Sequence, residues 1–307
     1  MIKRKAPLIT TARLAKICGV SQGTVDRALN GRGDINPETK QRILDTANKY
    51  GYRTSTQGVP EVIGIIVFDL DNRYFSDLVT AIEAEGAKRG YTTAVLLSHR
   101  DKTREIECIE TLYAMGVSGI CLCPINKGED FERFLLSLNM PVVTVGNRLS
   151  GITYVGIDNF AAVGEAVEQA AKKGYERFLY VAPDIDYEGA NADAPRLRID
   201  GFCARAQMLS LEHQVIYGLE NVPDLCNNTA VICSSDHYAL SLMSKARESG
   251  AGIMGFDNIK LLDKLNIPLD SVAYDTPSAA DAVLEIISTG KAYTKIINYK
   301  IIKRGSI

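Results

Sequence analysis

Residues 11–30 read TARLAKICGVSQGTVDRALN, and their pattern predicts two short helices joined by a tight turn. Gly19 is placed to end the first helix, and Ser21 is placed to cap the second. The positions expected to face a core are apolar and recur at helical spacing: Leu14, Ala15, Ile17, Cys18, Val25, Ala28 and Leu29. The positions expected to face out of the second helix are Gln22, Gly23, Asp26 and Arg27. This is the pattern of a helix-turn-helix.

A third helix is predicted directly after these two. Asn36 is its expected N-cap, Pro37 fits its first position, and Gly51 is its expected terminator. Its inward side chains are Ile43, Leu44, Ala47 and Tyr50. The sequence therefore predicts an all-α head over residues 1–53, and three short helices at this spacing favour a DNA-reading module over a small basic domain that binds protein.

The charge distribution favours the same interpretation. Through Arg53 the chain has eleven Lys and Arg residues against four Asp and Glu, a net charge of +7. The whole chain carries −2, so the remainder carries −9. Because DNA is a polyanion, it is attracted to the head and repelled by the rest of the chain.

Composition and length argue against several other classes of protein. A chain of 307 residues with 46% hydrophobic residues can form two or three domains. We find no signal-peptide core and no apolar run long enough to span a membrane, so we expect a cytoplasmic protein. The seven cysteines are mostly scattered, and only three histidines are present. Buried reduced thiols are expected, with no metal site and no cofactor.

Beyond the head, short apolar runs alternate with helical periodicity. The runs predicted to be strands are 62–68, 93–97, 120–123, 142–145, 178–181, 215–217, 230–233, 253–256 and 272–274. Such alternation predicts an α/β fold with parallel sheets covered by helices on both faces. Nine strands are too many for one compact sheet, and the weak stretch 147–156 separates two sets. We therefore predict two doubly wound subdomains after the head.

Polar and aromatic residues follow several predicted strands, where ligands bind in such folds. These residues are Asp69, Asp71, Asn72, Tyr74, Phe75, Asn147, Arg148, Ser235, Asp236, Asp257, Asn258 and Asp275. Together they suit a small polyhydroxylated or otherwise polar ligand. At any single position, an Asp or Asn after a strand is about as well explained as a helix N-cap or a turn residue.

The sequence contains no specific signature of an enzyme. Ser235, Asp236 and His237 are consecutive, so their side chains point in different directions and do not suit a hydrolytic triad. No P-loop, GxSxG or HExxH spacing occurs. An enzyme acting in the cleft would need an acid/base pair such as Asp257 and Asp275, which nothing in the spacing demands. We expect no enzymatic activity.

The segment VSQGTVDRALNGRGDINPETKQRILDTANKYGY resembles the DNA-binding head of the lactose-repressor (LacI/GalR) family of transcription regulators. Six further segments resemble, in order, that family's effector domain, which is similar to a type I periplasmic sugar-binding protein: IGIIVFDLDNRYF, VVTVGNR, RLRIDGF, AVICSSDHYAL, IMGFDN and SVAYDTPS. The resemblance implies an effector domain over 62–307. One subdomain would span about 62–147 plus 276–291, and the other about 157–274 plus 292–307.

The resemblance also implies site residues. In the head, Gln22 and Arg27 would contact base edges, and Gly23 would stand at a contact position without a side chain to use there. Phosphate contacts would come from Ser21, Thr24 and Asn30. Thr11, at the start of the first helix, would also lie near the DNA. The residues implied to line the effector cleft are Asn72, Tyr74, Phe75, Arg148, Arg198, Ser235, Asp257 and Asp275.

Two positions depart from the family pattern. The family has a hinge helix with a leucine that kinks the operator, whereas the linker here, residues 54–61, contains Gly58 and Pro60 and no leucine. Asp26 stands where the family commonly has Ser, close to the phosphates. The linker therefore predicts flexibly tethered heads and little bending of the DNA.

From these observations we expect a ligand-responsive transcription regulator, with repression the expected sign. It would bind a pseudo-palindromic operator in double-stranded DNA as a homodimer, without a membrane partner. Its effector would be a sugar, a sugar phosphate or a sugar acid. The alternative is a solute-binding or receptor protein whose head no longer reads DNA.

Overall fold

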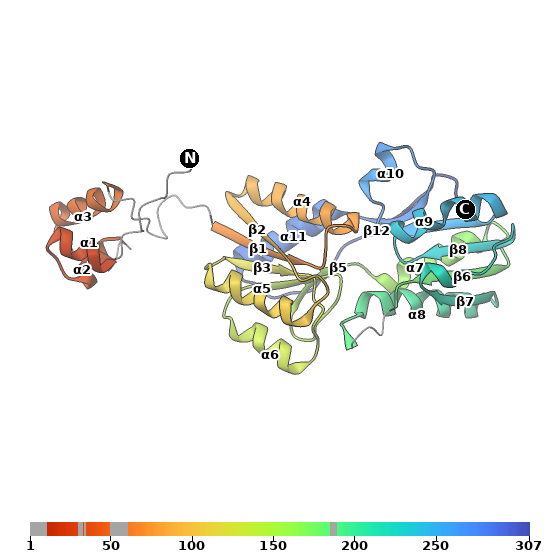
Figure 1. Ribbon diagram of the computed structural model, residues 1–307, viewed down its shortest axis with the longest axis horizontal. Coiled ribbons are helices and arrows are strands. Elements are labelled where there is room, and N and C mark those ends of the chain that lie inside the picture. Colours follow the sequence, from red (N-terminus) through yellow and green to blue (C-terminus); the bar gives the residue numbers. More distant parts are fainter. Residues whose placement is uncertain (1–10, 30–32, 34, 50–60, 185–188) are drawn as a thin grey trace. The chain divides into compact units, whose positions relative to one another are not determined.

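The computed structural model describes residues 11–29, 33, 35–49, 61–184 and 189–307. Contacts divide the chain into two compact units, Met1–Pro60 and Glu61–Ile307. Figure 1 shows helices in the described part of the first unit and alternating strands and helices in the second. Predictions about Asn30, Tyr50, Gly51 and linker residues 54–60 fall outside the described residues.

The first unit contains three helices, α1 (Thr11–Cys18), α2 (Gln22–Leu29) and α3 (Pro37–Lys49). Gly19, with φ of 64°, ends α1, and Ser21 Oγ accepts a hydrogen bond from Thr24 N at 3.1 Å. Asn36 Oδ1 accepts from Glu38 N at 2.9 Å, as expected of the N-cap of α3.

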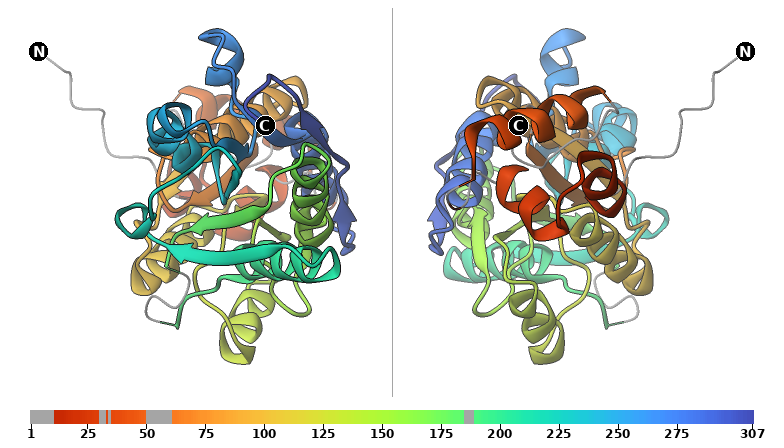
Figure 2. Two further views of the ribbon diagram at one scale, coloured as in Figure 1. Left: turned by 90° about the vertical axis from the view of Figure 1, so that its right-hand side faces the viewer. Right: turned by 90° about the vertical axis from the view of Figure 1, so that its left-hand side faces the viewer.

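The three helices pack around a small core, and the right-hand view of Figure 2 shows them crossing one another. Leu14, Val25 and Ile43 contribute to this core and are fully buried. The prediction for Ile17 was wrong, because this side chain is 44% exposed. Leu14, Ala15 and Cys18 already occupy the inward side of α1, and Ile17 lies beyond its edge.

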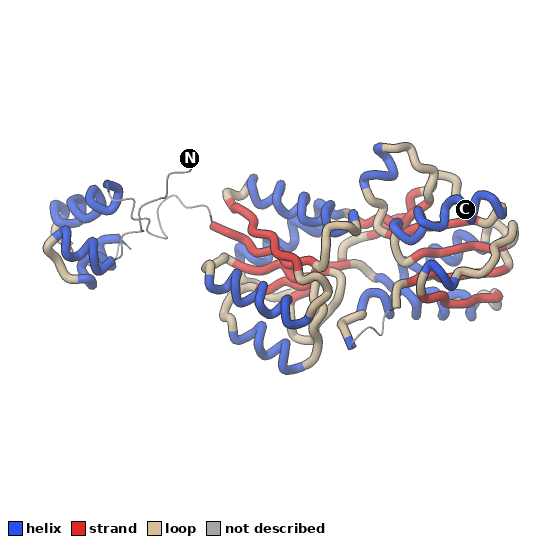
Figure 3. Tube along the Cα trace, in the orientation of Figure 1, coloured by secondary structure: helices blue, strands red, loops and turns tan. Residues whose placement is uncertain are grey.

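The second unit contains two six-stranded sheets, each part of one lobe. The first sheet has the order β11-β5-β4-β3-β1-β2, and all its pairings are parallel. Its strands are β1 (Glu61–Val67), β2 (Tyr91–Leu97), β3 (Gly119–Leu122), β4 (Val142–Val145), β5 (Thr153–Gly156) and β11 (Lys295–Ile296). The helices beside it in Figure 1, drawn in blue in Figure 3, are α4 (Arg73–Lys88), α5 (Lys102–Ala114), α6 (Glu129–Ser137) and α11 (Thr276–Thr289).

The second sheet has the order β12-β10-β9-β8-β6-β7. Its strands are β6 (Arg177–Ala182), β7 (Glu212–Tyr217), β8 (Thr229–Cys233), β9 (Gly252–Phe256), β10 (Asp270–Tyr274) and β12 (Tyr299–Ile302). Only β12 runs antiparallel to its neighbour among the described strands. The left-hand view of Figure 2 looks onto this lobe. Its helices are α7 (Asn159–Ala171), α8 (Asp193–Met208), α9 (Asp236–Ser249), the short α10 (Lys260–Lys264) and a 3-10 turn, Leu219–Asn221.

These sheets confirm the predicted fold class, a helical head followed by two doubly wound parallel sheets. All nine predicted strands are present. Each sheet is covered on both faces, which explains why the strands are apolar along most of their length.

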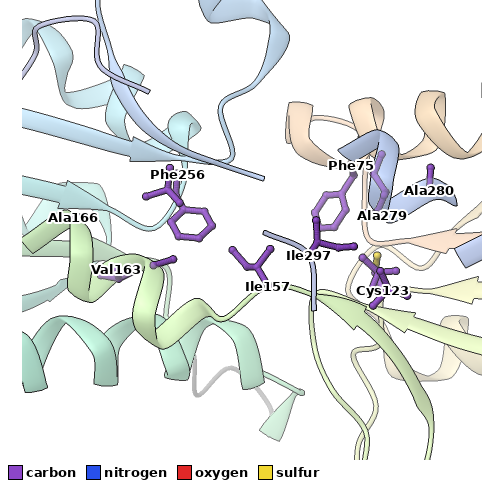
Figure 4. Packing of buried hydrophobic residues seen from close by; sticks show 14 of the residues in the cluster. Phe75, Cys123, Ile157, Val163, Ala166, Phe256, Ala279, Ala280 and Ile297 are labelled. Atoms are coloured by element: carbon purple, nitrogen blue, oxygen red, sulfur yellow. The ribbon is translucent and has the colours of Figure 1, made fainter. Parts of the chain in front are cut away.

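The expected boundaries between the lobes need three corrections. Stretch 147–156 is not a divider, because it contains β5 of the first sheet. Segment 292–307 is not wholly in the second lobe, because β11 pairs with β5 and only β12 joins the second sheet. The first strand also begins at Glu61, a residue assigned to the linker. In Figure 4, Ile157 lies where the chain passes between the Phe75 and Phe256 sides of the core.

Most of the thiols lie in the interior, as expected for reduced cysteines. Cys18, Cys108, Cys121, Cys123 and Cys233 are buried, Cys203 is partly buried and Cys226 is exposed. Burial raises the pKa of Cys121 to about 12. No described helix combines the length and apolar composition needed to cross a membrane.

Candidate functional site

A cleft of about 560 Å³ lies where the carboxyl ends of strands from both sheets face each other. Loops after β1, β2, β4, β6, β8 and β9 contribute to it, together with the first turns of α4, α8 and α9. Its lining consists of Phe68, Asp69, Asp71, Asn72, Tyr74, Phe75, Arg100, Cys123, Val145, Gly146, Asn147, Pro183, Asp184, Ala194, Pro195, Arg198, Ser234, Ser235, His237, Tyr238 and Asp257. The volume and the mixture of aromatic and polar groups suit a small polar ligand.

Six of the eight residues predicted for the cleft line it. These are Asn72, Tyr74, Phe75, Arg198, Ser235 and Asp257. They come from α4, α8, the N-caps of α4 and α9, and the turn after β9, so folding brings together segments up to 185 positions apart, the separation of Asn72 and Asp257.

Arg198 and Asp257 form the most buried charged pair of the cleft. Their side chains are 16% and 4% exposed, and Nη1 lies 4.0 Å from Oδ1. Arg198 is also held by Asn159 Oδ1, which accepts from Nε at 2.8 Å, and by the carbonyl of Ser234, which accepts from Nη1 at 2.6 Å. Its guanidinium stacks on Phe256, 3.5 Å from the ring centroid. This arrangement fixes the guanidinium before any ligand arrives.

The pKa of Asp257 is raised well above its ordinary value. Burial is the main cause, the charge of Asp236 adds to it, and the guanidinium of Arg198 opposes it. Beside a hydroxyl-bearing ligand, this carboxyl group can accept or donate a hydrogen bond according to its protonation.

Asn72 and Ser235 line the cleft and also cap helices. Asn72 Oδ1 accepts from Tyr74 N at 3.1 Å at the start of α4, and Ser235 Oγ accepts from Tyr238 N at 3.4 Å at the start of α9. These residues therefore act as helix N-caps and also line the cleft as predicted. Capping orients the aromatic residues behind each cap, because it fixes the first turn of the helix.

Arg148 and Asp275 are not among the residues that line the cleft, and their contact with an effector stays a prediction. Arg148, in the loop after β4, is exposed, and its guanidinium lies over Tyr154, 4.6 Å from the ring centroid. Asp275 is exposed at the N-terminus of α11, where its carboxylate accepts from Ser278 N at 3.1 Å and from Ser278 Oγ at 2.6 Å. The helix therefore uses this carboxylate.

Sequence reasoning missed Arg100, which lines the cleft at the end of β2. Its φ is 61°, its guanidinium lies 5.1 Å from the ring centroid of Phe68, and Nη2 lies 3.4 Å from Asp69 Oδ2. The preceding residue, His99, also has a positive φ, of 52°. The signal available in the sequence was the polar run 98–101 after an apolar strand.

Two sets of polar contacts join the lobes beside the cleft. Asn147 Nδ2 donates to the carbonyl of Asn191 at 2.8 Å, and Asn147 Oδ1 accepts from Ala194 N at 3.1 Å. Elsewhere, Asp77 Oδ2 accepts from Lys260 N at 3.2 Å, and Lys260 Nζ lies 3.7 Å from Asp77 Oδ1. If one lobe moves relative to the other, these hydrogen bonds and the ion pair either break or move with the lobes.

In the head, the predicted outward side of α2 is exposed: Gln22, Gly23, Asp26 and Arg27. Ser21 and Thr24 share a hydrogen bond of 2.9 Å between their hydroxyl oxygens, and Arg27 Nε donates to the carbonyl of Gly23 at 3.1 Å. Thr11 is the first residue of α1 and is partly buried.

Within the described residues, no group of three or more His, Cys, Asp or Glu side chains could hold a metal ion. The lining of the cleft provides hydrogen-bonding groups, charges and aromatic faces.

The chain is similar to a known protein family and to individual proteins of known function. The family model of periplasmic binding proteins and the sugar-binding domain of the LacI family matches residues 60–292. Catabolite control protein A of Staphylococcus xylosus is 25% identical over 288 residues, which are 86% of this chain and 87% of that protein.

Two solved structures show the same fold. The first is a periplasmic binding protein/LacI transcriptional regulator from Alkaliphilus metalliredigens in complex with D-xylulofuranose. It has a TM-score of 0.69 and 23% identity, over 79% of this chain and 97% of that chain. The second is the lac repressor dimer bound to operator and an anti-inducer, with a TM-score of 0.65 and 16% identity, over 97% of this chain and 98% of that chain.

Proposed function

Because the chain belongs to the family of periplasmic binding proteins and LacI-type sugar-binding domains, we propose that it is an effector-responsive, DNA-binding transcription regulator. The observation that carries the proposal is a cleft with the Arg198–Asp257 pair, in a chain that also has a basic helix-turn-helix head. The relative from Staphylococcus xylosus supports it, since the match covers 86% of this chain. Binding as a homodimer to a pseudo-palindromic operator, with repression as its outcome, is part of the proposal.

For the effector, we propose a neutral sugar. The cleft lining contains Asp69, Asp71, Asp184 and Asp257 but only two arginines, and Arg198 already faces Asp257. A sugar phosphate or sugar acid would bring a further negative charge beside these carboxylates. Neighbouring hydroxyls can instead bridge the guanidinium donors and the carboxyl group, with a sugar face on Tyr74 or Phe75.

A thermal-shift series with one carbon skeleton tests the effector. We expect D-xylulose to raise the melting temperature more than D-xylulose 5-phosphate or D-xylonate. At 100 times its dissociation constant, a ligand adds about 2.7 kcal/mol to the free energy of unfolding. A larger shift with the phosphate or the acid would contradict the assignment to a neutral sugar.

Binding to DNA tests the head and separates the proposal from a solute receptor with an inactive head. We expect salt-dependent binding of the chain to a fragment of its own promoter. The substitution Arg27→Ala should weaken specific binding by about 1 to 3 kcal/mol and binding to random DNA much less. Equal losses on both DNAs would make Arg27 a phosphate contact, and no binding by the unaltered chain would favour the receptor.

The linker prediction remains part of the proposal. Without a leucine to insert into the minor groove, the bound operator should be bent little, which energy transfer between dyes at the DNA ends can measure. A strong central kink would mean that another residue takes the place of the leucine.

An enzyme acting in the cleft is disfavoured by a specific observation. Such an enzyme would need an acid/base pair such as Asp257 and Asp275, and Asp275 caps α11 and is not among the residues that line the cleft. Turnover of D-xylulose by the chain would contradict the proposal.

A further inference from the structure

The turn after β9 has an unusual backbone. Asp257 has φ of 105° and Asn258 has φ of 48°, both in the region that side chains other than glycine rarely adopt. Such a conformation persists only where surrounding contacts hold it, and it often occurs at ligand sites. The sequence places no glycine at these two positions, so the turn depends on its contacts.

Two buried side chains hold this turn from the sheet side. Ser271 Oγ accepts from Asn258 N at 3.0 Å and donates to Asp236 Oδ1 at 2.6 Å. Asp236 Oδ2 accepts from Ile259 N at 2.8 Å. Both Asp236 and Ser271 are completely buried.

Arg304 holds the same turn from the other side. Its Nη2 donates to Asn258 Oδ1 at 2.7 Å and to Asp263 Oδ1 at 2.6 Å, and its Nη1 donates to the carbonyl of Leu269 at 3.0 Å. Arg304 follows β12, whose pairing with β10 brings the guanidinium to the turn. Three segments distant in sequence therefore converge on two consecutive residues.

The local sequence accommodates these contacts at some cost. A Cβ on Gly255 would collide with the Asp236 carboxylate, so only glycine permits this approach. Burial raises the pKa of Asp236 to about 6, and the hydrogen bonds from Ser271 and Ile259 and the charge of Arg304 oppose that rise. Burying a carboxylate is unfavourable, and here two hydrogen bonds and the charge of Arg304 offset it.

The turn carries two functional contacts. Its first residue, Asp257, faces Arg198 in the cleft. The residue after the turn, Lys260, contacts Asp77 of α4 in the other lobe through its backbone N and its Nζ. One short segment thus connects the cleft with a contact between lobes.

We propose that Asp236, Ser271 and Arg304 are positioning residues for effector binding: they hold the turn Asp257–Ile259 so that Asp257 faces Arg198 and Lys260 reaches Asp77. The inference rests on the effector role proposed above for the cleft. These three side chains act through the turn and do not line the cleft themselves.

Hydrogen exchange of the full chain without any sugar tests the positioning directly. Ser271→Ala removes the acceptor of Asn258 N, and Arg304→Ala removes the donor to Asn258 Oδ1. We expect the amides of residues 258–260 to exchange about tenfold faster in both variants, because a hydrogen-bonded turn opens more often once a partner is lost. Asp236→Asn is a third variant, which keeps the volume of the buried side chain.

Asp263→Asn is the matched control. It removes the exposed ionic partner of Arg304 and leaves the bond to Asn258, so exchange at 258–260 should stay within twofold of the unaltered chain. Unchanged exchange in Ser271→Ala and Arg304→Ala, or equal acceleration in Asp263→Asn, would overturn the proposal.

A second measurement connects the turn to the ligand. Calorimetry with D-xylulose, at a temperature where every variant is folded, should show about tenfold weaker binding by Ser271→Ala and no change in Asp263→Asn. A lower melting temperature with unchanged affinity would mean that the anchors serve stability alone and would overturn the proposal. If D-xylulose does not bind the unaltered chain, that counts against the proposed effector, while the exchange comparison still decides the role of the anchors.

Discussion

Strands β9 and β10 are parallel neighbours in the second sheet, and each ends in an aromatic residue followed by an aspartate. The two aspartates have different surroundings. Asp275 immediately precedes α11, adopts φ of −76° and caps the helix. Asp257 is followed by a turn, α10 begins three residues later, and its carboxyl group faces the cleft.

The difference shows what decides the role of a polar residue after a strand. Where the helix begins at the next residue, the carboxylate binds the free backbone amides of the first turn. Where the helix begins later, the carboxylate remains available to a ligand. Sequence alone assigns the same role to both aspartates, because the motifs FDN and YDT look alike.

Removal of the two aspartates should give the largest contrast. Asp257→Ala should weaken D-xylulose binding by about 2 to 5 kcal/mol, because it leaves the buried guanidinium of Arg198 without its charged partner. Asp275→Ala should leave that affinity unchanged. Titration calorimetry of both variants decides, and equal losses of affinity would eliminate the distinction between the two loops.

The second-largest effect should be on the free energy of unfolding, through the protonation of Asp236, which holds the turn after β9. Since the pKa of this carboxyl group is raised to about 6 in the folded chain, its contribution to stability is present at pH 4 and is lost as the pH rises through 6. Relative to Asp236→Asn, the unaltered chain should gain up to about 3 kcal/mol of unfolding free energy between pH 7 and pH 4.

Urea unfolding of both proteins across this range measures the difference. If the unfolding free energies of the two proteins change in parallel with pH, the pKa of Asp236 is not raised as expected.

Asp275→Ala should have a smaller effect, on stability. Loss of an N-cap costs about 1 kcal/mol, and α11 packs against α4 in the core of the first lobe. Asp275→Ser, which keeps a capping oxygen, is the control and should recover most of the loss in urea unfolding. No difference between Ala and Ser would mean that the cap contributes little.

A comparison of Asp257→Gly with Asp257→Ala should give the smallest effect. At φ of 105° glycine is unstrained, so the Gly variant should unfold with a free energy about 1 kcal/mol or less above that of the Ala variant. Both variants should bind D-xylulose equally poorly. A more stable Ala variant would indicate that the turn relaxes once the carboxylate is gone.

The parts of the fold that sequence patterns predicted are those with strong periodicity. The nine predicted strands were found because each contains an apolar run, and most of these runs are buried. Strands β5, β11 and β12 were missed: β5 is the half-buried run TYVG, β11 has two residues, and β12 is a four-residue strand at the edge of its sheet with no buried residue. Short edge pairings depend on neighbours that are distant in sequence, so a local pattern does not reveal them.

The candidate site divides in the same way. Asn72, Ser235 and Asp257 follow strands directly, and local position was enough to find them. Arg198 lies mid-helix and came from the family resemblance. Arg100 depends on a left-handed backbone after β2, which no residue type there announces.

The distribution of thiols has a practical consequence for following this molecule in solution. Burial raises the pKa of the Cys123 and Cys233 thiols well above their ordinary value, which suppresses the reactive thiolate. Cys226 is exposed, between the 3-10 turn and β8. A maleimide fluorophore should therefore attach first at Cys226, and a second dye on a cysteine introduced at exposed Tyr113 of α5 would report the separation of the lobes as sugars are added.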